Sequence, residues 1–193
     1  MARRVRKDTW KTKKWYKVMA PPMFDEREIG ETPSSDPNAI LGRRLQTTLK
    51  ELTGNIRKGS KVKVDFEVES VTGTTAKTRF HSMELVRSYV RSMVRRRVSR
   101  IDPIFIVDTK DTDKLRVKAL LITTRRVRTS IKDALRRETA RLIQTAAKER
   151  TTDEFVKSIA DDALTKELRT GLHAIYPLKK VEIRKIESLR PKA

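Results

Sequence analysis

The stretch GNIRKGSK, residues 54–61, resembles a nucleotide-binding P-loop in its two glycines and its lysine. The P-loop pattern is G-x-x-x-x-G-K-[ST], whereas here Ser60 precedes Lys61. A P-loop must also open a helix, because its amides and the helix N-terminus hold the phosphates together. The residues that follow Lys61 have the pattern of a strand instead. We therefore predict a hairpin loop in which Arg57, Lys58 and Lys61 contact RNA phosphates.

Two other arrangements raise the question of metal chemistry. Asp108, Asp111 and Asp113 lie within six residues, as a Mg²⁺-dependent nuclease would need. Their spacing lacks the turn glycine and the terminal glutamate of a calcium loop, and Asp and Thr are common in turns. His81 and His173 have no cysteine and no H-E-x-x-H spacing beside them. We expect a turn and two structural histidines, with no catalytic residue, no metal site and no cofactor.

Unpaired arginines are the more informative feature. Between Ser82 and Ile101 six arginines accompany a single acid, Glu84, so carboxylates four residues away cannot neutralise them. Arginine can bind a phosphate through two donors and can stack on a base. We predict that this segment binds RNA through Arg87, Arg91, Arg95, Arg96, Arg97 and Arg100.

The excess of positive charge continues further along the chain. Residues 114–150 contain twelve basic residues and three acids, whereas residues 151–170 contain more acids than bases. Such segregation of sign is typical of a binding surface. The predicted RNA contacts of this part are Arg125, Arg126, Arg128, Arg137 and Arg141. The acidic segment is expected to face water or another protein.

The whole sequence points to a polyanionic partner. It holds 46 Lys and Arg against 25 Asp and Glu, a net charge of +21, and no cysteine. No apolar run approaches the roughly 20 residues that span a bilayer, and the basic start lacks the apolar stretch of a secretory signal. We expect a cytoplasmic protein with no membrane partner and no small-molecule substrate.

The N-terminal residues are expected to form a separate arm. Residues 1–17 contain eight basic residues and one acid, with aromatic residues among them. Such a segment cannot bury enough apolar area to order alone, and its aromatic rings could stack on exposed bases. The predicted contacts are Trp10, Lys11, Lys13, Lys14, Trp15 and Tyr16. Packing of Trp15 and Tyr16 against the protein's own sheet is an equally good alternative.

The remaining pattern predicts the elements that position these residues. We expect a disordered arm over residues 1–18, a Pro/Gly-rich linker over 19–42 and one globular domain over 43–193. Alternation of apolar and polar residues predicts strands, and apolar residues at helical spacing predict helices. The predicted strands lie near 45–49, 62–68, 75–81, 104–107, 114–124 and 178–185, and the predicted helices near 83–101, 130–148 and 151–171. The fold class is α+β, with a β-barrel-like antiparallel or mixed sheet flanked by helices.

RNA suits this arrangement better than DNA. A helix that reads a DNA major groove usually belongs to a helix-turn-helix and carries Asn, Gln and Ser. The arginine-rich helix predicted here lies between strands. A β-rich body with basic helices and an aromatic arm is typical of proteins that bind shaped RNA.

Three segments resemble a known family. KKWYKVMAPPMFDEREIGET (residues 13–32), RFHSMELVRSYVRSMVRRR (79–97) and IYPLKKVEIRKIESL (175–189) are similar to the archaeal and eukaryotic small-subunit ribosomal protein family S-three-A-e, or eS-one. They match its K-x-W-Y-x-V-x-A-P-x-x-F, F-H-x-M-[DE]-L-x-R and I-Y-P-L-x-x-V-x-[IV]-R-K-[IV] segments. The chain is shorter than eukaryotic members and resembles an archaeal one.

The resemblance implies a β-barrel body flanked by helices and docked on 16S-type rRNA at the platform of the small subunit, near the mRNA exit. It implies neighbouring small-subunit ribosomal proteins and nearby mRNA as partners, and no catalysis. The alternative function is a free-standing RNA chaperone or DNA-compacting basic protein. Mg²⁺-dependent RNA cleavage at the three aspartates ranks third.

Overall fold

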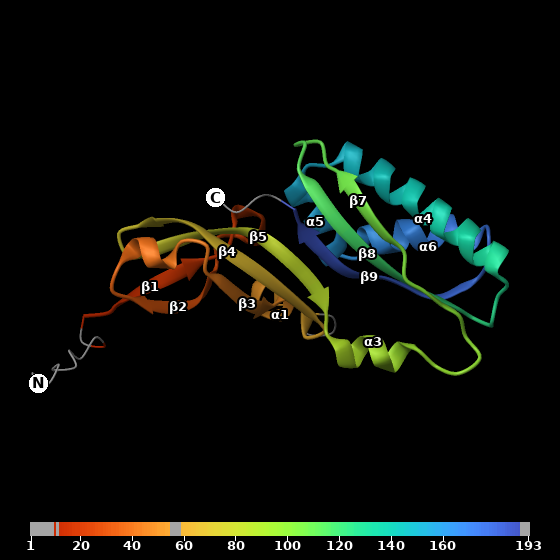
Figure 1. Cartoon of the computed structure of the whole chain (residues 1–193), viewed down its shortest axis with the longest axis horizontal. Coiled ribbons are helices and arrows are strands. Elements are labelled where there is room, and N and C mark those ends of the chain that lie inside the picture. The colour runs from red at the N-terminus through yellow and green to blue at the C-terminus, as the bar shows by residue number, and fades with distance from the viewer. Residues whose placement is uncertain (1–9, 11, 55–58, 190–193) are drawn as a thin grey trace, which may run out of the picture.

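The structure, a computed structural model, describes Trp10, residues 12–54 and residues 59–189 (Figure 1). This part of the chain forms an α+β fold with nine strands in one mixed sheet and five α-helices, which confirms the predicted fold class. The strands are β1 (Lys14–Met19), β2 (Glu28–Ser34), β3 (Arg44–Thr48), β4 (Val62–Thr72), β5 (Thr75–Leu85), β6 (Arg100–Ile101), β7 (Ile104–Asp108), β8 (Lys114–Thr123) and β9 (Leu178–Ser188). The helices are α1 (Leu49–Thr53), α3 (Arg87–Met93), α4 (Thr129–Glu149), α5 (Thr152–Ala160) and α6 (Ala163–His173), with short 3-10 turns at Pro22–Phe24 and Pro37–Ile40.

The long strand β5 joins two halves of the molecule (Figure 1). Its first residues pair in parallel with β1, and its whole length pairs with β4, which gives the order β2-β1-β5-β4-β3 in one half. The side chain of Arg43, just before β3, donates to the Thr32 hydroxyl and to the Pro33 carbonyl of β2. The two outer strands of this half are thus bridged, and the sheet curls like part of a barrel.

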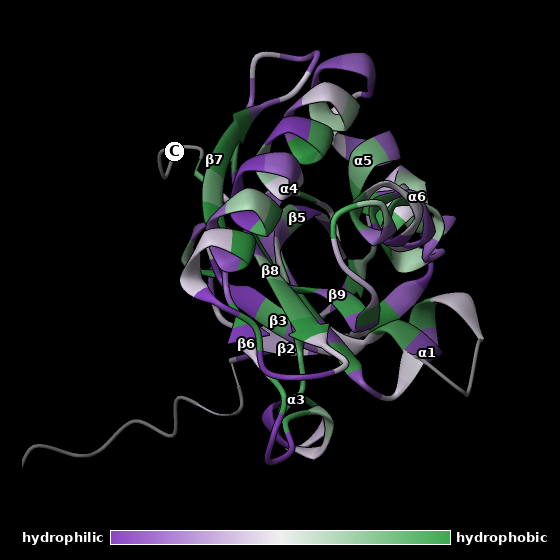
Figure 2. Ribbon diagram, turned by 90° about the vertical axis from the view of Figure 1, so that its right-hand side faces the viewer, coloured by the Kyte–Doolittle hydropathy of each residue, from purple (hydrophilic) through white to green (hydrophobic). Residues whose placement is uncertain are grey.

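The last residues of β5 pair with β9 and begin the other half. There β9 pairs with β8, and β8 pairs with β7 near its start and with β6 near its end. Helices α4, α5 and α6 lie together on one side of these strands (Figure 1). Figure 2 shows α4 with both hydrophilic and hydrophobic residues, as expected of a helix with one buried side.

Two apolar clusters form the core, and the larger one contains residues of both halves. The larger one lies between the helices and the sheet and includes Phe66, Leu121, Leu135 and Phe155, all fully buried. The smaller one lies within the curled half, around Val18 and its neighbours. None of the helices in the described part of the chain combines the length and apolarity needed to cross a bilayer.

The N-terminal half differs from the predicted arm and linker. Residues 14–19 form β1, where Tyr16 and Val18 are buried, and residues 28–34 form β2 inside the predicted linker. Pairing with β5 supplies the apolar neighbours that the basic segment lacks by itself. Because β2 lies at the outside of the sheet, it tolerates a proline. Residues 1–9 and 11 lie outside the described residues.

The predicted helix over residues 83–101 is also corrected. The chain stays extended to Leu85, because Glu84 pairs with Lys185 and Leu85 with Val62. Helix α3 then runs only from Arg87 to Met93. The period-3.6 spacing of apolar residues was therefore overridden at both ends by strand pairing, and Arg95, Arg96 and Arg97 follow the helix instead of extending its ridge.

Most predicted elements of the C-terminal half are confirmed. Strands β7, β8 and β9 and the long helix α4 lie where the pattern predicted them. Helix α5 begins with a capping box, since the Thr151 hydroxyl accepts from the Glu154 amide and the Glu154 carboxylate accepts from the Thr151 amide. The helix predicted over residues 151–171 is divided into α5 and α6, and Gly171 does not end it. Gly171 lies inside α6, where a Cβ would meet Leu142 Cδ1 at 2.8 Å, so it lets α6 approach α4 closely.

Candidate nucleic-acid interface

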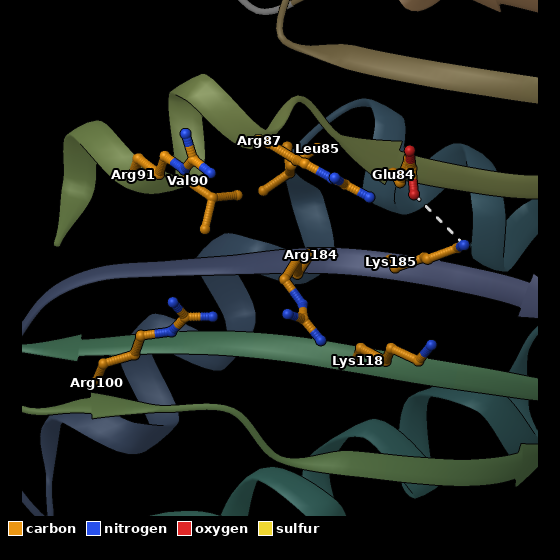
Figure 3. A pocket seen from close by; sticks show the side chains of 9 residues that line it. All are labelled: Glu84, Leu85, Arg87, Val90, Arg91, Arg100, Lys118, Arg184 and Lys185. Atoms are coloured by element: carbon orange, nitrogen blue, oxygen red, sulfur yellow. Dashed lines mark ion pairs between the residues drawn. The ribbon is translucent and has the colours of Figure 1, made fainter.

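A cleft of about 360 Å³ lies between α3 and the strands β8 and β9 (Figure 3). Its lining combines six basic side chains with one acid and two apolar residues. The basic residues are Arg87, Arg91, Arg100, Lys118, Arg184 and Lys185, and the others are Glu84, Leu85 and Val90. The sequence prediction had placed three of these cations, Arg87, Arg91 and Arg100, in the RNA-binding set.

The strand faces explain why the cations gather here. Lys118 is paired with Lys185 and with Ile104, so their side chains share one face of the sheet. The helices α4 to α6 cover the opposite face, on which Val117 and Ile186 are buried. In the described structure, the charged residues of the face toward α3 are thus not covered by α4 to α6, and with α3 they line the cleft.

A β-bulge in β9 places Arg184 and Lys185 next to each other on the cleft face. The pairing of β8 and β9 shifts between Lys118 and Ala119, so that Arg184 has no partner of its own on β8. A bulge redirects the side chains beside it. Here it turns Ile186 into the core, while Lys185 faces the cleft.

The sequence reading did not include Arg184 among the RNA contacts. The signal was nevertheless present in the sequence. The alternation of Val181 and Ile183 would put Lys185 in the core, and a buried lysine at that position indicates a register shift.

Carboxylates neutralise part of this surface. Glu187 accepts from Lys118 at 3.3 Å, from Lys185 at 2.8 Å and from Arg116 at 3.5 Å. Burial by itself raises the pKa of Glu187, but the hydrogen bonds and charges of Lys185 and Lys118 outweigh it and lower that pKa overall. The same hydrogen bond from Lys185 to Glu187 raises the pKa of Lys185. The strands thus carry a fixed ion-pair network.

Other cations keep their charge unpaired. Arg100 binds Asp102 at 2.7 Å, and Arg141 binds Glu138 at 2.6 Å, so these two predicted contacts have internal partners. Among the described residues, no carboxylate lies within ion-pair distance of Arg87, Arg91 or Arg184. The same holds, within the described part, for the predicted contacts Arg95, Arg96, Arg97, Arg125, Arg126, Arg128 and Arg137, all of which are exposed. The Arg137 guanidinium donates to the Asp133 carbonyl at 3.5 Å.

Tyr89 anchors α3 beside the cleft. Its hydroxyl donates to Glu182 at 3.2 Å and accepts from Lys180 at the same distance. The ammonium groups of Lys61 and Lys180 lie 4.7 and 5.0 Å from the centre of its ring. Burial, followed by the charge of Glu182, raises the pKa of the Tyr89 hydroxyl. The predicted contact Lys61 therefore lies against α3, while Arg57 and Lys58 lie outside the described residues.

The predicted aromatic contacts separate into two groups. Tyr16 is only 4% exposed and belongs to the core, so it packs on the protein body. Trp15 points to the other side of β1 and is 56% exposed, and Trp10 is 61% exposed with the Lys13 ammonium 4.4 Å from its ring centre. Lys14 is exposed on β1, and Lys11 lies outside the described residues.

Three of the candidate metal and proton-transfer residues, Asp111, Asp113 and His81, have structural partners, whereas Asp108 and His173 are exposed. The carboxylates of Asp111 and Asp113 accept from the amide and hydroxyl of Thr152 at 3.0 and 3.1 Å, which ties the turn to the start of α5. His81 Nδ1 lies 3.4 Å from Glu67, and burial together with the charge of Arg44 lowers the pKa of His81. In the described ranges, no three His, Asp or Glu side chains are grouped as a metal site would need.

The family model and three similar relatives all point to the same protein family. Residues 1–191 match the Ribosomal S3Ae family. The small ribosomal subunit protein eS1 of Methanopyrus kandleri is 44% identical over 187 residues, which cover 95% of this chain and 88% of that protein. The protein of the same name from Methanothermobacter thermautotrophicus is 44% identical over 191 residues, 99% of this chain and 97% of that protein. The one from Aeropyrum pernix is 41% identical over 187 residues, 95% of this chain and 87% of that protein. With the match extending over nearly its whole length, this chain belongs to the ribosomal S3Ae family.

Proposed function

We propose that this chain is a structural protein of the small ribosomal subunit that binds and braces 16S-type rRNA at the platform, near the mRNA exit. The family and the names of its relatives support the ribosomal role. Such a protein works in the cytoplasm, within the subunit, and its role is to position RNA and not to catalyse a reaction.

The observation that carries the rRNA proposal is the set of exposed arginines without carboxylate partners around α3. Among the predicted arginine contacts in the described structure, only Arg100 and Arg141 have a carboxylate within ion-pair distance. Phosphate oxygens are the complementary ligand, since a guanidinium binds them through two parallel donors. The proposed contacts are therefore the unpaired arginines first, with Trp10, Trp15, Lys13 and Lys14 as a second set.

The acidic segment 151–170, which forms α5 and most of α6, suits a different partner. Asp153, Glu154, Asp161 and Glu167 are exposed in it, and like charge repels RNA phosphates. We assign this side to neighbouring small-subunit proteins. Messenger RNA near the exit would meet the same cationic surfaces as rRNA.

The salt dependence of rRNA affinity tests the proposal. If about eight phosphates are engaged, log affinity falls against log salt with a slope of about −6 to −7. Replacing Arg87, Arg91 and Arg95 together by Gln should make the slope shallower by about 2 to 3, because each lost phosphate contact removes about one released counterion. Filter binding to 16S-type rRNA fragments measures both slopes.

The matched control removes the same charge elsewhere. Lys157, Lys166 and Arg169 are exposed on α5 and α6, and replacing these three by Gln should leave the slope unchanged. Equal effects of the two triple variants would show that net charge, and not this surface, governs binding. Co-sedimentation adds a second check, since recovery away from 30S particles after a moderate salt wash would favour a free-standing RNA chaperone or DNA-compacting protein.

A further inference from the structure

The cleft between α3 and β9 has the size and the lining of a site for a small organic group. Its volume of about 360 Å³ lies at the lower end of the roughly 300–1,000 Å³ of pockets that hold such ligands. Leu85 and Val90, which are 6% and 9% exposed, line it with apolar surface. A single phosphate group needs neither this volume nor an apolar wall.

The free cations of the cleft come from both of its sides. Arg87 and Arg91 project from α3, and Arg184 projects from the bulge of β9 across toward β8 (Figure 3). No described carboxylate neutralises these three, whereas Glu187 holds Lys118 and Lys185. The cleft therefore offers unpaired guanidinium groups on opposite walls, which can bind a phosphate or stack on a base.

The single acid of the lining, Glu84, makes the two ends of the cleft different in charge. Glu84 lies beside Lys185, 3.4 Å from its ammonium group, at the end away from Arg91 (Figure 3). Because Glu84 is paired with Lys185, that end attracts a phosphate less strongly than the unpaired guanidinium groups of Arg91 and Arg184 do. A base can occupy the rest of the cleft, since its edges carry amino groups that a carboxylate accepts.

We propose that this cleft receives one unpaired nucleotide of the bound RNA, with the base inside and its phosphate on Arg91 and Arg184. The proposal rests on the rRNA-binding function proposed above and adds the kind of RNA feature that the surface selects. Proteins recognise RNA mainly at loops and bulges, where an unstacked base can leave the helix. Arg184, which the bulge leaves without a partner on β8, is then one of the cations that bind the phosphate of the extruded nucleotide.

The test compares RNA hairpins that differ in one nucleotide. The full-length protein is titrated with a fully paired hairpin and with four hairpins carrying a single bulged A, C, G or U. The wild-type protein should bind at least one bulged hairpin about tenfold more tightly than the paired one, as expected for one stacked base. Arg184→Met, which keeps the aliphatic stem, should abolish that preference. Arg137 is exposed on α4, outside the cleft. Arg137→Met should lower the affinity for the paired and the bulged hairpins by the same factor, so the preference for the bulged hairpin should remain.

The alternatives are distinguishable. If the wild-type protein binds all five hairpins within twofold, or if Arg184→Met weakens paired and bulged hairpins equally, the cleft contacts backbone phosphates only and the inference is wrong, while the rRNA-binding proposal stands. Loss of salt-dependent binding to every hairpin would instead reject the rRNA-binding proposal itself. Thermal unfolding of each variant, followed by circular dichroism, confirms that the comparison concerns folded protein. Arg87→Met serves as a second cleft variant and should reduce the same preference.

Discussion

At the scale of single residues, a carboxylate decides whether a cation stabilises the fold or remains for a ligand. Glu67 is 4% exposed and lies 3.4 Å from Arg44, from Arg79 and from His81. The described part of the chain gives Arg87 and Arg184 no comparable partner. The same residue type thus has a structural role on β3 to β5, and beside α3 we propose an RNA-binding role for it.

Removing the Glu67 charge tests the structural role. Glu67→Gln keeps the shape of the side chain but leaves Arg44 and Arg79 without their carboxylate. We expect the free energy of unfolding to fall by about 2 kcal/mol, less than the roughly 3–5 kcal/mol for a fully buried pair, because both arginines are partly exposed. Urea denaturation measures the change.

The control is Glu69→Gln, an exposed acid on the same strand, which should change the unfolding free energy by less than about 0.5 kcal/mol. If Glu67→Gln matched this control, the ion-pair cluster would not stabilise the fold. Affinity for rRNA should be nearly the same in both variants, since neither touches the cleft.

At the scale of elements, local signals predicted the structure where they agreed with strand pairing. The alternation in β4, β5 and β8 and the apolar stripe of α4 were sufficient, because each buries one continuous face. The segments that became β1 and β2 carry charge, proline and glycine, and their strand form depends on pairing with β5. Local pattern alone could not predict them.

The candidate site, like the fold, could be predicted only in part from the sequence. Charge counting identified Arg87 and Arg91 on α3, and it also selected Arg100 and Arg141, which have internal partners. Counting acids along the sequence misses pairs that the fold creates, such as Arg44 with Glu67 across two strands. Arg184 was missed because it lies outside the arginine-rich segments of the sequence, and only the pairing of β9 with β5 and β8 brings it to the cleft beside α3.

The capping box of α5 gives a prediction at this scale. Thr151→Ala removes the hydroxyl that accepts from the Glu154 amide at 3.3 Å. We expect the free energy of unfolding to fall by about 1 kcal/mol, the usual effect of losing an N-cap. Thr170→Ala, an exposed threonine inside α6, is the matched control and should have less than half this effect in the same denaturation experiment. Equal effects would mean that the box does not stabilise the helix.

At the scale of the whole molecule, cationic and acidic side chains lie on different parts of the surface, which suit different partners. Among the described residues, exposed arginines and lysines without carboxylate partners lie around α3, on the link before α4 and at the N-terminal strand, while exposed acids lie on α5 and α6. Helices α4 to α6 lie on one side of the sheet, which leaves the ion-pair network of Glu187 and the cleft on the other (Figures 1 and 3). We propose that the side with the cleft binds nucleic acid and that the acidic segment 151–170 contacts a protein neighbour.

The structure of this chain within its own assembled small subunit, determined by electron cryomicroscopy, tests the central claim most directly. The quantity to measure is the distance from the guanidinium nitrogens of Arg87, Arg91 and Arg184 to the nearest acceptor oxygen. The account predicts rRNA phosphate oxygens within hydrogen-bonding distance, about 3 Å, for these three arginines. Guanidinium groups that point into solvent, or that pair with carboxylates of this or a neighbouring protein, would contradict it.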